Sequence, residues 1–171
     1  MDYLKQFSIP FKGMLDGVHQ YGFDLEEDFF SRFPESPIGK CRLRADFQTD
    51  KQGSIMTVDL RISGTAVLPC DRCLADIDLP VRGDYRLILK QAVGTPDDPD
   101  LYFIGPDDHE WNIAEVLYEY SCLSVPMSRR IECESMDPAP CNREVLGKFE
   151  EDKENFEQNP LWDELKKLNL K

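Results

Sequence analysis

Long apolar stretches, which a membrane-spanning helix or a secretory signal requires, are missing from this sequence of 171 residues. No run approaches the roughly 20 apolar residues that cross a bilayer. The N-terminal segment Met1–Phe7 has no basic region followed by an apolar one, so we expect no signal peptide. The sequence therefore predicts a cytosolic protein that does not insert into a membrane.

Histidine is also scarce, and the motifs of the common enzyme classes are absent. The two histidines, His19 and His109, stand alone, with no metal ligand or nucleophile at a suitable spacing. No Gly-rich phosphate-binding loop, Ser/His/Asp arrangement or H-E-x-x-H sequence occurs. We therefore expect a binding protein rather than an enzyme, without a small-molecule substrate.

Basic residues are few relative to acidic ones. The chain has 20 Lys and Arg residues against 33 Asp and Glu residues, a formal net charge of −13. Proteins that bind nucleic acids gain affinity by neutralising phosphates with Lys and Arg, so this balance works against general affinity for RNA. It favours encounters with basic proteins, although a local basic patch can still contact RNA.

What the sequence does contain is a series of segments in which apolar and polar residues alternate. Segments 40–47, 56–63 and 77–89 have this period of two, which is typical of half-buried strands. The turn-like Thr49–Gly53 joins the first two segments, which predicts a hairpin. One wet and one dry face indicate an antiparallel sheet. Gly83, inside the third segment, predicts a bulge or a bend.

Other segments predict the remaining elements. Further strands are expected at 7–11, 17–25 and 101–104, and a short helix at 26–33. The main helix is predicted to begin at Asn112, a favoured N-cap, with Glu115 in the capping-box position. Pro126 marks its end. The fold class is therefore α+β, with a mainly antiparallel sheet that can curl towards a barrel and one packed helix.

Composition divides the chain into a domain at 1–148, an acidic linker at 149–158 and a C-terminal helix and tail at 159–171. Asn159 as N-cap and Pro160 at the first helical position indicate where this last helix begins. Its apolar stripe consists of Leu161, Leu165 and Leu168. We expect the stripe to dock on the protein's own sheet; the alternative is a groove on a partner.

Six cysteines in a reducing compartment indicate metal binding, redox chemistry or burial rather than disulfides. Cys70 and Cys73 form a C-x-x-C between two predicted strands, which is half of a tetrahedral zinc site. Cys133 and Cys141 can complete it, so we expect these four cysteines to hold a structural Zn²⁺ ion. The alternative is four reduced thiols that bind no metal.

Two other functions of the C-x-x-C stay open: a thiol-disulfide oxidoreductase, and a zinc storage or delivery protein with a labile site. The segment after Cys73 is predicted to be a strand, and so lacks the helix N-terminus that lowers a catalytic thiol's pKa. This disfavours redox chemistry. The other cysteines, Cys41 and Cys122, fall among core positions and are expected to act as small hydrophobic residues.

Arginine and lysine residues near these segments are candidates for contact with RNA or a partner protein. They are Lys40, Arg42, Arg44, Arg72, Arg129 and Arg130. A zinc ion that joins the two cysteine regions would bring Arg72 close to Arg129 and Arg130 and make a local basic patch suited to phosphate. A solvated strand face with scattered surface arginines is the alternative.

Three segments together resemble the YceD family. They are the C-x-R-C-L element in Leu68–Leu74, the helix that begins at Asn112 and leads to Pro126, and the ending from Asn159-Pro160 to Leu168. The resemblance implies a bacterial cytosolic factor needed for the accumulation of large-subunit ribosomal RNA. It would bind a pre-ribosomal particle, through the RNA or through a basic ribosomal protein. The family implies no catalytic residues.

Overall fold

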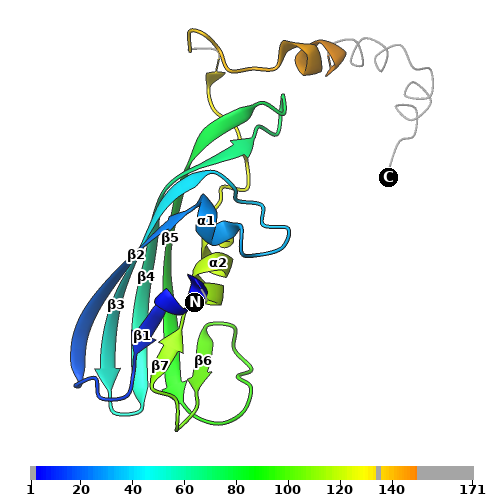
Figure 1. The fold of residues 1–171 in the computed structure, drawn as a ribbon. Helices are drawn as coiled ribbons and strands as arrows, with labels where there is room; N and C mark the ends of the chain where they lie inside the picture. Colours follow the sequence, from blue (N-terminus) through cyan, green and yellow to red (C-terminus); the bar gives the residue numbers. More distant parts are fainter. Residues whose placement is uncertain (1–2, 134–135, 150–171) are drawn as a thin grey trace, which may run out of the picture. The chain divides into compact units, whose positions relative to one another are not determined.

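The computed structural model describes residues 3–133 and 136–149 (Figure 1). The chain divides into two compact units. The sheet unit comprises Met1–Leu68 and Asp78–Met127, and the cysteine unit comprises Pro69–Ile77 and Ser128–Lys171. Residues 150–171, which hold the expected C-terminal helix and all but the first residue of the expected acidic linker, lie outside the described residues.

A five-stranded sheet forms the body of the sheet unit. Its strands, in spatial order, are β2 (Gly17–Glu26), β3 (Cys41–Gln52), β4 (Ile55–Pro69), β5 (Asp76–Gln91) and β6 (Leu101–Ile104). β2 pairs with β3, and β3 with β4, in antiparallel register. The short β6 runs parallel to β5. The mainly antiparallel α+β fold is confirmed, and the sheet stays open between its edges β2 and β6 rather than closing into a barrel.

The smaller elements of the sheet unit gather on one face of this sheet (Figure 1). They are the 3₁₀ helix η1 (Tyr3–Gln6), the antiparallel pair β1 (Ser8–Pro10) and β7 (Glu110–Asn112), and the helices α1 (Glu27–Phe30) and α2 (Ala114–Leu123). Within this covering layer the ring centroids of Phe7 and Phe29 lie 4.8 Å apart, and between the layer and the sheet those of Tyr120 and Tyr85 lie 4.6 Å apart.

The alternation predicted from the sequence sets which face is covered. On β3, Leu43, Ala45 and Phe47 are buried, whereas the intervening Arg42 and Arg44 are exposed. The same alternation continues along β4 and β5. The apolar residues of the three strands therefore form one core with the aromatic side chains of the covering layer, because burial removes them from water on that face only.

Gly83, where the sequence predicts a bulge or a bend, lies in the middle of β5. Burial alternates along β5 without a break on either side of this residue. A Cβ on Gly83 would clash with the Ser124 hydroxyl and with the Tyr85 ring. The glycine leaves room for these two side chains to meet, and the two hydroxyl oxygens are 3.0 Å apart.

The main helix begins slightly later than predicted. Asn112 is the last residue of β7, and its side-chain oxygen accepts a hydrogen bond from the Ala114 N–H at 3.0 Å. The N-cap residue of α2 is Ile113, which makes no side-chain cap. Asn112 therefore does stabilise the start of the helix, but as the end of a strand rather than as the first residue of a capping box.

Two acidic loops flank β6. The loop at 92–100 carries Asp97, Asp98 and Asp100, and the loop at 105–109 carries Asp107 and Asp108; all five residues are exposed. Tyr120 donates a hydrogen bond of 2.6 Å to the Asp100 carboxylate, which ties the first loop to α2.

In the described part of the chain, no helix is long and apolar enough to cross a membrane.

Candidate functional site

A tight turn between β4 and β5 presents the C-x-x-C. The Cys70 N–H donates to the Ala75 carbonyl at 2.8 Å, and the Leu74 N–H donates to the Cys70 carbonyl at 2.9 Å. The Arg72 N–H points at the Cys70 sulfur, 3.4 Å away. The turn thus directs one of its backbone donors at a cysteine sulfur.

Leu74 closes this turn in an unusual conformation. Its φ of +58° lies in the left-handed region, which costs a residue with a Cβ about 1–2 kcal/mol. Its side chain is 65 % exposed, so burial compensates for little of that cost. The conformation places the following residue, Ala75, where its backbone N–H reaches the sulfur of Cys73.

The second cysteine segment lies beside this turn, within the same unit. The Cys141 thiol donates to the Cys133 sulfur at 2.7 Å. The Cys73 sulfur interacts with both Cys70 and Cys141, so contacts link all four cysteines. We call this set the cysteine cluster. Cys70, Cys73 and Cys133 are buried, and Cys141 is half-buried. The structure therefore brings together the two stretches that the sequence analysis paired on chemical grounds.

The electrostatics of the cluster differ from one thiol to the next. The pKa of Cys73 is lowered, first by the hydrogen bond from the Ala75 N–H and then by one from the Asn142 N–H. The pKa of Cys141 is raised to about 11, mainly because its thiol donates to the Cys133 sulfur. The surroundings of the two thiols therefore shift their pKa values in opposite directions.

The cluster supplies donors of the right kind for zinc, but it does not form a coordination sphere. Two sulfurs bound to one tetrahedral zinc lie about 3.8 Å apart, as follows from Zn–S bonds of about 2.3 Å. The Cys133–Cys141 separation of 2.7 Å is shorter than that and longer than a disulfide bond of about 2.05 Å. Among the described residues, no three His, Cys, Asp or Glu side chains are arranged to hold a metal ion.

An ion pair that the sequence analysis missed fastens the two segments together. The Asp71 carboxylate accepts hydrogen bonds from the Arg129 backbone N–H at 2.8 Å and from its Nε at 2.9 Å. The Asp71 N–H donates in return to the Arg129 carbonyl at 3.0 Å. The pKa of Asp71 is lowered, first by the hydrogen bond from the Arg129 backbone. The only sign of this pair in the sequence is that the two residues carry opposite charges, and they lie 58 positions apart.

The predicted contact residues divide between the two units. Arg72, Arg129 and Arg130 belong to the cysteine unit, whereas the remaining three belong to the sheet unit. Arg130 is exposed, and Arg129 is engaged with Asp71. On β3, the Arg44 guanidinium bridges two carboxylates and therefore carries little unbalanced charge.

The two carboxylates that the Arg44 guanidinium bridges belong to Asp24, at 2.9 Å, and Asp46, at 3.0 Å. Arg42 is exposed on the same face of β3, opposite Glu26 in the neighbouring strand. Lys40, just before β3, lies with Arg42 beside a hollow whose other lining residues include Glu26, Glu27 and Asp28. Carboxylates therefore accompany the basic side chains along this part of the sheet.

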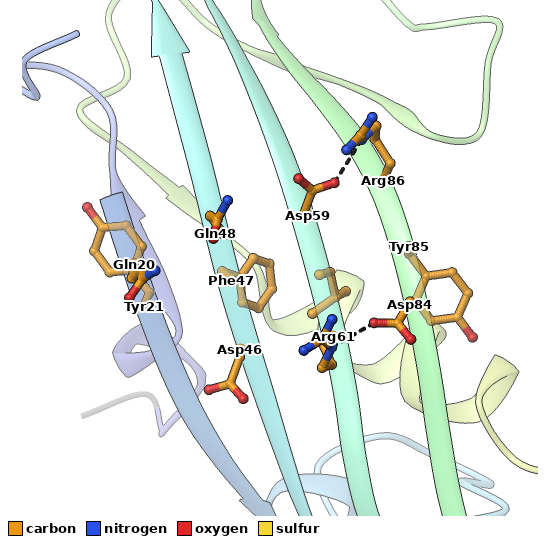
Figure 2. A pocket seen from close by; sticks show the side chains of 11 residues that line it. Gln20, Tyr21, Asp46, Phe47, Gln48, Asp59, Arg61, Asp84, Tyr85 and Arg86 are labelled. Carbon is orange, nitrogen blue, oxygen red and sulfur yellow. Dashed lines mark hydrogen bonds and ion pairs between the residues drawn. The ribbon is translucent and has the colours of Figure 1, made fainter. Parts of the chain in front are cut away.

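The uncovered face of the sheet contains a second candidate surface, a shallow hollow of about 820 Å³ that spans β2 to β5 (Figure 2). Its charged side chains pair across strands: Arg61 with Asp84, and Arg86 with Asp59, each at 2.7 Å. Gln20 and Gln48 also lie in it. Each arginine of the hollow faces a carboxylate, which leaves little free positive charge for phosphate.

Cys41 and Cys122 lie apart from the cluster, in the sheet unit. Both are half-buried. Burial raises the pKa of Cys41 to about 12 and also raises the pKa of Cys122. Of the two histidines, His19 is half-buried with its Nε2 2.9 Å from the Leu15 carbonyl, and the His109 side chain is exposed. Neither belongs to the cluster.

Comparison with known proteins identifies the family. The model of the family described as large ribosomal RNA subunit accumulation protein YceD matches residues 58–169, which is more than half of the chain and includes the whole cysteine cluster. No curated protein matches. No solved structure matches either. The chain therefore belongs to the YceD family of large ribosomal RNA subunit accumulation proteins.

Proposed function

We propose that this protein is a non-enzymatic cytoplasmic factor that promotes the accumulation of large-subunit ribosomal RNA by binding a pre-ribosomal particle. The match to the YceD family over residues 58–169 is the observation that carries the proposal. The matched residues include both cysteine segments. We assign the contact with the particle to the cysteine cluster and the arginines around it.

The partner in the particle is a basic ribosomal protein. Two observations favour protein over RNA: the formal net charge of −13, and the pairing of arginines such as Arg44 and Arg129 with carboxylates. A negative chain attracts a basic protein over a distance, whereas phosphate would need unpaired cations. Arg72 and Arg130 then serve as contacts at the edge of the interface rather than as a phosphate-binding patch.

A structural zinc ion held by Cys70, Cys73, Cys133 and Cys141 makes this surface rigid. Support comes from the burial of three of the thiols and from the backbone N–H groups directed at the sulfurs of Cys70 and Cys73. Zinc would replace the hydrogen bond between Cys141 and Cys133 and would hold four thiolates, with release of the protons. The Asp71–Arg129 pair already joins the same two segments without a metal.

Elemental analysis of untagged protein tests the zinc proposal. We expect about one zinc per chain in the wild type and little in Cys73→Ser. Cys122→Ser is the matched control, because this half-buried cysteine lies outside the cluster, and it should keep its zinc. Metal-free protein with a readily oxidised thiol pair would contradict the proposal and favour a thiol oxidoreductase. Zinc that exchanges within minutes with a chelator would instead favour a storage or delivery protein.

Depletion of the protein in its own host tests the role. Large-subunit ribosomal RNA should fall relative to small-subunit RNA, and plasmid-borne wild type or Cys122→Ser should restore it, whereas Cys73→Ser should not. The wild type should also sediment with large-subunit precursors and crosslink to a basic ribosomal protein. Crosslinks to RNA alone would overturn the choice of partner, and an unchanged ratio of the two RNAs would overturn the role itself.

A further inference from the structure

β2 is an edge strand whose outer side pairs with nothing in the described part of the chain. It is 10 residues long and pairs with β3 along its whole length without a bulge (Figure 1). Half of the backbone N–H and C=O groups of an edge strand point away from the sheet and can template another strand. β2 contains none of the lysines, prolines or bulges that commonly guard such an edge.

The side chains of β2 are incompletely covered as well. Tyr21 and Phe23, on the side facing the core, are only half-buried, although Phe23 packs against Phe7 and Phe47. On the opposite face, Val18 is 61 % exposed. Aromatic residues on a strand are stabilised by aromatic neighbours across the strand pair, and β2 has such a neighbour on one side only.

We propose that β2 pairs with β2 of a second copy of this chain, antiparallel and about a two-fold axis through Gly22. An axis perpendicular to the sheet keeps the core-facing side of both copies on the same face, so residues pair only with residues of the same face. With Gly22 on the axis, Tyr21 of each copy lies opposite Phe23 of the other, and both half-buried aromatic side chains gain a cross-strand partner.

The charges of β2 are compatible with this register. Its two acidic residues lie opposite neutral ones: Asp24 opposite Gln20, and Glu26 opposite Val18 of the second copy. An axis moved to Asp24 would place two Asp24 carboxylates opposite each other, and like charges at that position destabilise a strand pair. With the axis at Gly22, the two sheets would join into one continuous sheet across the dimer. The hollow that spans β2 to β5 in each copy would lie on its uncovered face.

The register makes a test with opposite signs possible. Sedimentation equilibrium of the reduced full-length protein, between about 1 and 300 µM, should show a monomer–dimer equilibrium. Gln20→Glu adds a carboxylate opposite Asp24 twice per dimer and should weaken dimerisation roughly three- to tenfold, whereas Gln20→Lys should strengthen it by a similar factor. Ile88→Glu and Ile88→Lys, at a 43 % exposed position of β5, are controls that change the net charge equally.

Hydrogen exchange supplies a second measurement. Amides of 17–26 should become more protected as the concentration rises through the dimerisation range, and those of β5 should not. A monomer at every concentration would overturn the proposal, and so would equal effects of the Gln20 and Ile88 substitutions. Protection of 17–26 that does not depend on concentration would also overturn it, because another part of the same chain would then cover the edge.

Discussion

Two buried serines near the end of α2 differ in a way that gives a sharp test of the core. Ser121 is fully buried, and its Oγ has no hydrogen-bond partner among the described residues. Ser124, three residues on, is also buried, but its hydroxyl donates to the Tyr120 carbonyl at 2.6 Å and lies 3.0 Å from the Tyr85 hydroxyl. The same substitution should therefore have opposite effects at the two positions.

Ser121→Ala should stabilise the protein. A buried hydroxyl without a partner costs about 1–3 kcal/mol, and alanine in place of serine adds roughly 0.5 kcal/mol of helix propensity. We expect the free energy of unfolding to rise by about 1–2 kcal/mol after partial relaxation of the site. For a chain of this size, each kcal/mol corresponds to about 2–4 °C in Tm. Urea denaturation followed by circular dichroism measures both variants against the wild type.

Ser124→Ala is the matched control, since it removes the same atom from the same helix end. It deprives Tyr85 of its hydroxyl partner and should cost about 1–2 kcal/mol. A stability loss in Ser121→Ala as large as that in Ser124→Ala would refute the reasoning, because the Ser121 hydroxyl would then have a partner of its own. An unchanged slope of the urea transition is required for the comparison.

Three other substitutions or conditions probe the cysteine unit and β3. Leu74→Gly should raise the free energy of unfolding by about 0.5–1 kcal/mol, because the strain energy removed from the left-handed conformation exceeds the free-energy cost of the entropy that glycine adds to the unfolded chain. A lower Tm would contradict this. The lowered pKa of Asp71 means that its pair with Arg129 stabilises the folded state fully above the unfolded pKa of about 3.8, and that this contribution disappears as pH falls through the lower folded pKa. The stability difference between wild type and Asp71→Asn should accordingly be largest near neutral pH and vanish in strong acid, as urea titrations at several pH values would show. Alkylation of Cys41 by iodoacetamide, followed by mass spectrometry, should be slow at pH 8 and rise about tenfold per pH unit towards its pKa of about 12; rapid modification at neutral pH would show that the thiol is not held as described.

Side-chain periodicity was enough to predict most of the sheet. The alternation in 40–47 and 56–63 gave β3 and β4, because one face of each strand is buried and the other is wet. The short β6 was predicted at Leu101–Ile104, and those are its observed bounds. Its parallel pairing with β5 was not predicted, because an isolated strand of four residues has a composition but no mark of direction.

The proximity of the four cysteines was predictable from the sequence, whereas the contacts that hold their two segments were not. The shared chemistry of thiols was enough to pair Cys70 and Cys73 with Cys133 and Cys141 across the sequence. The fixing of Arg129 by Asp71 was not foreseen, because surface charges are numerous and most of their combinations never meet. Nor could the left-handed Leu74 be inferred, since glycine or asparagine is the usual signal for that conformation.

The two loops beside β6 concentrate negative charge at one edge of the sheet unit. On the uncovered face of the sheet, arginines and carboxylates cancel in pairs, so the potential there decays within a short distance. The loops at 92–100 and 105–109 contain no arginine or lysine that could balance the charges of Asp97, Asp98, Asp107 and Asp108. At physiological ionic strength, where the screening length is about 8 Å, this uncompensated negative charge attracts a cationic surface to the β6 edge of the sheet unit.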